Sequence, residues 1–227
     1  MTDTELIRAR WSRIRAAHKA DLPALTVARA EAFLRDHPDC GPAWKILGSA
    51  LLDLARHDAA QAALKRALAL CPAEKLWIPL SEMGHLHRAR GELKAAAAWY
   101  RQAIDFAPQE ASPHIYLGGV LARSGHLSEA EASQRAAIRC TLGCRDEAYL
   151  NLGVVLRAQG RYEEAATCFE QALALSPKYA AARKALRDVR CAIRYGQVAR
   201  PSVAVRQAER VIEVPRVEMV EVAEAGS

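Results

Sequence analysis

The chain has 227 residues, of which 51% are hydrophobic, 6% are aromatic and 26% are charged, and its formal net charge is +6. This length is compatible with one or two globular domains or with an array of about six helix pairs, and the apolar content is sufficient for a continuous core. No apolar run reaches the roughly 18 residues of a membrane span, and the first residues lack the basic and apolar regions of a secretory signal, so we expect neither feature.

The composition predicts an all-α fold. Alanine supplies much of the apolar content, whereas only 3 phenylalanines occur. Alanine is the strongest helix former and lets helices approach one another closely. Before residue 200 there are no runs in which Val, Ile or Thr alternate with polar residues, as strands would require.

The charge distribution and the cysteine content indicate which partners and which compartment to expect. The positive charge is spread thinly along the chain, with its largest excess after residue 180. Nucleic-acid-binding proteins usually concentrate basic residues on one face, so this distribution argues against that class. The 6 cysteines are too few for a disulfide scaffold at this length, and free thiols in a reducing cytoplasm are the simplest interpretation.

Residue types recur at a nearly fixed interval through most of the chain. Glycines that are 36, 34 and 35 residues apart form one column: Gly48, Gly84, Gly118 and Gly153. Two columns of alanine keep the same intervals: Ala60, Ala96, Ala130 and Ala165, and Ala67, Ala103, Ala137 and Ala172. Three columns that share one irregular spacing predict a repeat array, in which each unit buries its apolar face against its neighbours.

Residues 1–40 are predicted to form a degenerate first helix pair. Trp11 precedes Trp44 by 33 residues, and Leu34 precedes Leu68 by 34 residues, so this segment follows the repeat interval. The turn between its two helices has no glycine, unlike the turns of most later units.

Residues 41–74 are the first full unit. Apolar residues at offsets of three, four and seven define one face of a first helix: Trp44, Leu47, Gly48 and Leu51. The pattern breaks near Ala55 and then resumes in a second helix. That helix is predicted to end before Pro72, because proline lacks the N–H group and clashes with the preceding turn.

Three further units follow at 77–110, 111–144 and 146–179. Gly91, Gly125 and Gly160 occupy the turn between the two helices of each unit, where a positive φ favours glycine. The unit at 111–144 lacks a proline after its second helix, and we expect that helix to end with the help of Gly143.

The last part of the chain divides into a helix and a tail. Residues 180–195 are predicted to form a capping helix, because an apolar stripe runs beside four arginines: Ala182, Leu186, Val189 and Ile193, and Arg183, Arg187, Arg190 and Arg194. Residues 196–227 are predicted to be a flexible tail. Its Val- and Glu-rich part, 211–222, is a hypothetical acidic ligand for the chain's own basic groove.

The residue order within each unit resembles the tetratricopeptide repeat. The unit at 146–179 carries the pattern most completely, with Tyr149, Leu152, Gly153, Leu156, Gly160, Tyr162, Ala165, Phe169, Ala172 and Pro177. The resemblance covers 41–179 as four repeats and implies a right-handed α-solenoid of antiparallel helix pairs, closed by the C-terminal capping helix. It also implies that the first helix of each pair lines a concave face, where peptides or partner helices bind.

This mapping predicts a peptide-binding groove whose residues come from four first helices: Lys45, Ser49, Asp53, Ser81, His85, Arg88, Ile115, Arg123, Leu150, Asn151 and Arg157. Their charge is mildly basic, which favours an acidic peptide or protein partner. The chain is therefore interpreted as a non-catalytic, cytoplasmic protein–protein interaction adaptor or scaffold with no cofactor. The alternatives are a self-associating scaffold and an accessory subunit that positions the substrate of an enzyme, and the oligomeric state stays open.

Other binding modes fit the sequence less well. A chaperone-tail clamp needs amide and basic groups, but only Lys45 is suitable, whereas Ser49, Glu82 and Tyr116 stand at the other clamp positions. The arginines of 183–194 lack the interleaved aromatic residues that stack on bases, so we do not expect nucleic acid as a partner.

Metal binding and catalysis also lack support in the sequence. Cys140 and Cys144 are four residues apart, and His85 and His87 are predicted to point to different faces of one helix, so no tetrahedral zinc set is formed. No phosphate-binding glycine loop, nucleophile elbow or metalloprotease motif occurs, and we expect neither a catalytic residue nor a metal.

Overall fold

The computed structural model describes residues 3–195, and the segment 196–227, with its hypothetical groove ligand at 211–222, lies outside them. Within the described residues the chain forms antiparallel helix pairs, and its elements have these bounds: α1 Asp3–Lys19, α2 Pro23–Asp36, α3 Gly41–Asp53, α4 His57–Leu70, a short 3-10 turn Ala73–Lys75, α5 Trp77–Ala89, α6 Leu93–Phe106, α7 Ala111–Arg123, α8 Leu127–Arg139, α9 Arg145–Ala158, α10 Tyr162–Leu175 and α11 Ala180–Tyr195. None of these helices is long and apolar enough to cross a membrane.

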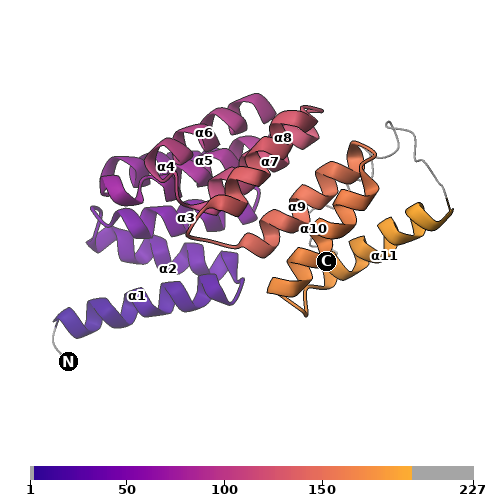
Figure 1. Cartoon of the computed structure of the whole chain (residues 1–227). Coiled ribbons are helices and arrows are strands. Elements are labelled where there is room, and N and C mark those ends of the chain that lie inside the picture. The colour runs from indigo at the N-terminus through magenta and orange to yellow at the C-terminus, as the bar shows by residue number, and fades with distance from the viewer. Residues whose placement is uncertain (1–2, 196–227) are drawn as a thin grey trace, which may run out of the picture.

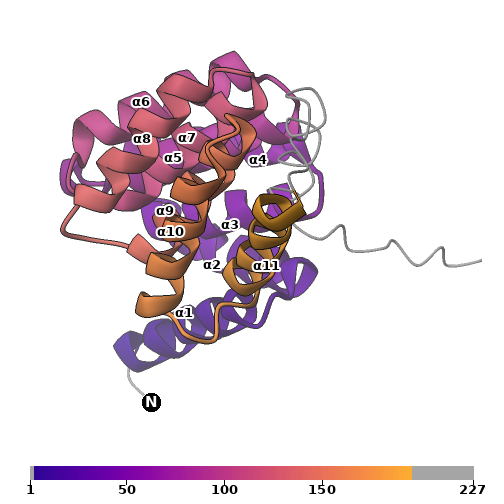
Figure 2. The ribbon, with the colours of Figure 1, turned by 45° about the vertical axis from the view of Figure 1, so that its right-hand side comes forward.

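The pairs stack into one curved array (Figure 1). Each helix packs against its neighbours in the chain, from α1 against α2 to α10 against α11. The first helices of successive pairs also touch one another, α3 with α5, α5 with α7, α7 with α9 and α9 with α11. Because elements converge on the inner side of a curve, α3, α5, α7 and α9 line the concave face. The turned view shows α9–α11 in front, with α5–α8 above them and α1 below (Figure 2).

The glycine column marks the closest approach of the two helices in each pair. A Cβ atom on Gly84 would lie 2.3 Å from the ring of Tyr100, and one on Gly153 would lie 2.5 Å from the ring of Phe169. Gly48 meets Leu64 and Gly118 meets Gln134 in the same way. Each partner side chain is fully buried, so the glycine provides the socket that a large side chain of the second helix fills.

The two alanine columns are buried completely. All eight residues have 0% exposure: Ala60, Ala96, Ala130 and Ala165, and Ala67, Ala103, Ala137 and Ala172. A larger side chain at these positions would separate the helices, so the alanines set the spacing on which the stacking of pairs depends.

The turns between paired helices take a left-handed residue throughout the array. Gly91, Gly125 and Gly160 have φ values of 78°, 82° and 80°, which confirms the role predicted for them. The first two turns place Asp21 and Ala55 at φ values of 52° and 55° instead. The turn geometry is therefore kept even where the sequence offers no glycine.

The expected helix end at Gly143 is wrong. Helix α8 ends at Arg139, four residues earlier, and Gly143 has a φ of 100° in the connection that follows. There the carbonyl oxygen of Leu142 accepts a hydrogen bond of 2.9 Å from the backbone N–H of Ala111. The glycine thus lets an extended connection lie against the start of α7, a pairing between distant segments that local sequence does not reveal.

Helix α11 covers the last pair as a cap. Ala182 and Val189 are fully buried and Leu186 is 8% exposed, whereas Ile193 at its end is 40% exposed. The apolar stripe therefore packs on α9 and α10 over most of its length, and the arginines beside it remain on the outer side.

The contact between Gly153 and Phe169 can be tested by substitution. We expect Gly153→Ala to destabilise the fold by about 2–3 kcal/mol, because the new methyl group displaces the buried ring of Phe169. Gly119→Ala, in a neighbouring first helix where an added Cβ meets nothing within 4 Å, should stabilise it by about 0.5–1 kcal/mol. Urea unfolding of both variants measures the difference, and equal effects at the two sites would contradict the socket explanation.

Candidate functional site

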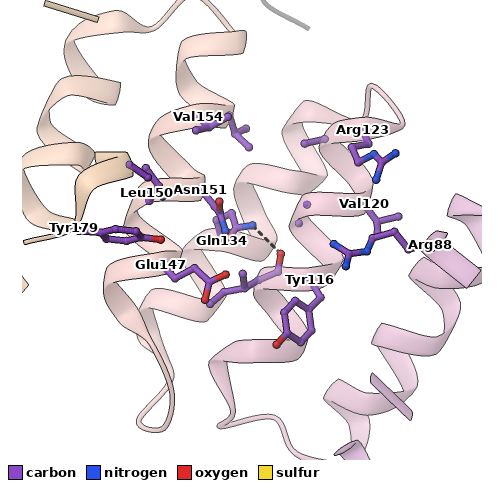
Figure 3. Close-up of a pocket in the computed structure, with 16 residues that line it drawn as sticks. Arg88, Tyr116, Val120, Arg123, Gln134, Glu147, Leu150, Asn151, Val154 and Tyr179 are labelled. Atoms are coloured by element: carbon purple, nitrogen blue, oxygen red, sulfur yellow. Dashed lines mark hydrogen bonds between the residues drawn. The ribbon is translucent and has the colours of Figure 1, made fainter. Parts of the chain in front are cut away.

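A pocket of about 350 Å³ opens on the concave side between α7 and α9 (Figure 3). Apolar side chains form part of its wall: Ile115, Val120, Leu150, Val154 and Val155. Polar and charged side chains also line it: Arg88, Tyr116, Arg123, Gln134, Glu147, Asn151 and Tyr179. The pocket therefore combines an apolar surface with several groups able to form directional contacts, which is the usual composition of a binding site.

The buried Gln134 of α8 lies behind the wall of this pocket. Its Nε2 donates a hydrogen bond of 3.0 Å to the carbonyl oxygen of Ile115, and the side chain is fully buried. Because a carbonyl oxygen only accepts, this bond fixes the orientation of the amide. The Oε1 atom then has no hydrogen-bond partner among the described residues. A buried acceptor without a donor costs free energy.

Two arginines define one side of the pocket. Arg88 is half-buried on α5 and Arg123 is exposed at the end of α7; Figure 3 shows both on the side opposite Leu150 and Tyr179, with the guanidinium group of Arg88 turned toward the pocket. Neither forms an ion pair with an acidic side chain within residues 3–195, where other arginines such as Arg10 and Arg90 are paired. Both positive charges are therefore available to an acidic group of a ligand.

An acidic residue with two tyrosines nearby occupies the other side. Glu147 belongs to the first turn of α9, and burial raises the pKa of its carboxyl group, with a further contribution from Asp146. Burial also raises the pKa values of Tyr116 and Tyr179, and in both cases the Glu147 charge adds to the effect. The two hydroxyl groups are therefore neutral at physiological pH.

His85 belongs to an aromatic cluster next to the pocket. Its Nδ1 atom lies 2.8 Å from the hydroxyl oxygen of Tyr100, and its ring centroid is 4.4 Å from that of Tyr116. Burial lowers the pKa of His85 to about 3, with smaller contributions from Arg88 and Lys45. The residue predicted to line the groove is thus a neutral part of its wall and contributes no charge.

On the concave face near α3, oppositely charged side chains of the chain lie close to one another. Lys45 Nζ lies 3.8 Å from the carboxylate of Glu82, and both side chains are largely buried. Burial raises the pKa of Glu82, whereas Lys45 opposes that effect and the neighbouring Ser49 does so to a smaller extent. Asp53 is exposed on the same helix, and desolvation together with Asp21 raises the pKa of its carboxyl group. The predicted cation at Lys45 is therefore already paired.

The remaining predicted residues divide between the pocket and other places. Ser81 is 4% exposed and donates its hydroxyl hydrogen to the carbonyl oxygen of Trp77, within its own helix. Arg157 is half-buried away from the pocket; burial lowers its pKa, and Asp188 of α11 opposes that effect. The predicted residues that line the pocket together are Arg88, Ile115, Arg123, Leu150 and Asn151.

Sequence reasoning missed several residues of the pocket, among them Tyr116, Glu147, Gln134 and Tyr179. Glu147 lies four positions before Asn151, so the helical period that selected Asn151 could also have selected it. Gln134 had a visible signal, because it occupies the position of Leu64 and Phe169 in other units. Tyr179 precedes α11 in a connection, where no periodic pattern predicts the direction of a side chain.

Tetratricopeptide repeat family models match the chain at residues 13–75, 84–125 and 146–179, together more than half of its length. The human Tetratricopeptide repeat protein 7A is 38% identical over 92 residues. That match spans 40% of this chain but only 11% of the human protein.

Solved structures show the same architecture. TTC0263, a thermophilic TPR protein of Thermus thermophilus, matches 81% of this chain and 98% of its own, with a TM-score of 0.63 and 21% identity. Cut9–Hcn1 of the APC/C matches 84% of this chain and 40% of its own, with a TM-score of 0.64 and 19% identity. YrrB, described as a TPR protein with an unusual peptide-binding site, matches 77% and 88% with a TM-score of 0.54 and 17% identity. These likenesses confirm the predicted all-α, right-handed solenoid.

The ion pair between Lys45 and Glu82 should contribute to stability in a pH-dependent way. Lys45→Met should destabilise the fold by about 1–2 kcal/mol at pH 7, because it leaves the Glu82 carboxylate buried without its cation. The folded-state pKa of Glu82, already above its ordinary value of 4.5, then rises further, so folding takes up a proton. The loss should shrink as the pH falls through that folded-state pKa. Thermal unfolding from pH 7 to pH 5 tests this, with exposed Lys65→Met as the control; a pH-independent loss would contradict it.

The buried amide of Gln134 should lower the stability of the fold. Gln134→Leu should stabilise it by about 1 kcal/mol, because it removes an unpaired buried acceptor and installs the residue type found at Leu64. Urea unfolding measures the gain, and Gln102→Leu on the exposed side of α6 is the matched control, with an expected change within about 0.5 kcal/mol. A clear loss of stability at position 134 would show that the Ile115 hydrogen bond outweighs the unpaired oxygen.

Proposed function

Because the chain belongs to the tetratricopeptide repeat family, we propose that it is a non-catalytic adaptor or scaffold that binds a segment of a partner protein on its concave face. The observation that carries this proposal is the pocket between α7 and α9, where the unpaired Arg88 and Arg123 lie beside an apolar wall. The reported peptide-binding site of YrrB, a protein of the same fold, supports this type of ligand.

The preformed pocket explains how binding would proceed. Its wall comes from helices held rigidly by the glycine sockets, so little conformational freedom is lost when a ligand binds. A single segment in such a groove corresponds to an affinity of about micromolar order. The two arginines favour an acidic group in the segment, and Asn151 offers an amide that can bond a peptide backbone.

The chemistry of the site supports recognition rather than catalysis. His85 is held neutral next to Tyr100, and the pocket lining includes no Ser, Thr or Cys as a nucleophile among the described residues. We place the protein in the cytoplasm as part of this proposal, because its few cysteines suit a reducing compartment.

Self-association is a second candidate. Large apolar side chains on the first helix pair are partly exposed, namely Leu6 and Leu25, with exposures of 46% and 39%. Exposed apolar side chains on an outer helix pair of a repeat array form a surface on which a second copy can stack.

The role of the two arginines on the concave face can be tested by affinity capture from source lysate. The full chain should retain a partner, and the double variant Arg88→Glu/Arg123→Glu should retain at least about tenfold less of it, because repulsion replaces attraction at the pocket. The control Lys65→Glu/Arg139→Glu makes the same change of charge on exposed residues of α4 and α8 and should retain the partner. Equal retention by all three proteins would move the site elsewhere, and recovery of only the chain itself would favour self-association.

A further inference from the structure

We propose that the pocket accepts a lysine or arginine side chain of the partner segment between Tyr116 and Tyr179, with Glu147 as its counter-ion. The segment would then carry a basic residue at the α9 side of the pocket and an acidic residue at the α5–α7 side. This inference rests on the proposed function of the concave face and specifies the chemistry of its ligand.

The position of the three side chains supports this assignment. Tyr116 comes from α7, Glu147 from α9 and Tyr179 from the connection before α11, and all three line one pocket. Figure 3 shows Glu147 and Tyr179 on the side away from Arg88 and Arg123, with Tyr116 near the lower opening. The site is therefore polarised, with negative charge toward α9 and positive charge toward α5 and α7.

Glu147 differs from two carboxylates of similar burial, Glu82 and Glu131, which have cation partners. Glu131 is paired with Arg135 at 2.8 Å and with Arg161 at 2.6 Å, and Glu82 is paired with Lys45. Glu147 is half-buried and has no cation partner within residues 3–195, and the charge nearest to it on its own helix is the acidic Asp146. Only the positive end of the α9 dipole compensates it. A ligand cation would supply the pairing that the chain provides elsewhere.

The uncharged groups around Glu147 are also suited to a cation. The faces of two neutral tyrosine rings attract ammonium and guanidinium groups, and their hydroxyl oxygens can accept hydrogen bonds. Lysine and arginine side chains carry only donors, so they complement this set of acceptors better than any acidic or apolar side chain.

The opposite side of the pocket sets the direction of the segment. Arg88 and Arg123 have no acidic partner among the described residues, and they would repel the basic side chain that Glu147 attracts. A segment of mixed charge satisfies both sides, whereas a purely acidic segment leaves Glu147 uncompensated and faces its repulsion. The ligand therefore differs from the simple acidic peptide that the sequence alone favours.

The test uses the full chain and synthetic octapeptides with blocked termini, so that only side chains carry charge. Each peptide holds one leucine for the apolar wall, one lysine and one glutamate at varied positions in an Ala/Gly/Ser background. Fluorescence anisotropy measures the dissociation constants. Replacing the lysine of the best peptide by norleucine should weaken binding about tenfold in the wild type but less than about twofold in Glu147→Gln.

Two controls keep the result interpretable. Glu163→Gln makes the same change on an exposed residue of α10 and should retain the full dependence on lysine. If Glu147→Gln fails to fold, the half-buried Tyr179→Leu replaces it and should weaken lysine-containing peptides about threefold without affecting norleucine peptides.

Each other outcome would overturn the inference. Peptides that depend on Arg88 and Arg123 but not on lysine would overturn it while the proposed function stands. The absence of binding up to about 1 mM, both by the full chain and by the variant in which the tail residues Arg206, Arg210 and Arg216 are changed to alanine, would overturn both. Lysine-dependent binding that appears only after the tail residues Arg206, Arg210 and Arg216 are changed to alanine would assign the site to the chain's own tail instead of a partner.

Discussion

The contact between a glycine of the first helix and a large side chain of the second is the constraint on which the array depends. At Gly84 and Gly153 even one methyl group would overlap an aromatic ring, so each pair can close only if this position stays empty. The buried alanines then bring successive pairs together at a similarly short distance. Because both contacts use small residues, stability comes from interlocking shapes along the stack, and the inner faces of the first helices are left free for other roles.

One unit fills its socket with a polar residue, and the pocket lies there. Gln134 meets Gly118 as Phe169 meets Gly153, but its amide leaves an oxygen unpaired beside the cavity. An aromatic ring at this position would form a better core. Gln134 is therefore not the residue that would make this unit most stable. Positions where the residue type departs from what stability favours tend to be functional. The neighbouring Gly119 enlarges the same opening, since no side chain projects from it.

The sequence predicted the array well and the site only in part, for a physical reason. Periodic columns report which face of a helix is buried, so the helix pairs, the turn glycines and the cap on α10 could all be read from spacing. The same spacing selects residues on an inner face without revealing their partners on other helices. Lys45 is neutralised by Glu82 of the next pair, and Arg157 lies near Asp188. The connection that carries Tyr179 has no period at all, so its contribution to the pocket depends on the tertiary structure.

The distribution of charge along the inner face therefore matters more than its sum. Near α3 and α5 the groups are satisfied internally, since Lys45 is paired and His85 is neutral. Arg88 at the C-terminal end of α5 and the residues between α7 and α11 leave their charges open and separated by sign, with Arg88 and Arg123 on one side and Glu147 on the other. A net charge of +6 suggests a preference for acids but contains no information about this separation. Since the open charges occupy one end of the array, specificity would be decided there, while the self-neutralised end contributes surface and shape.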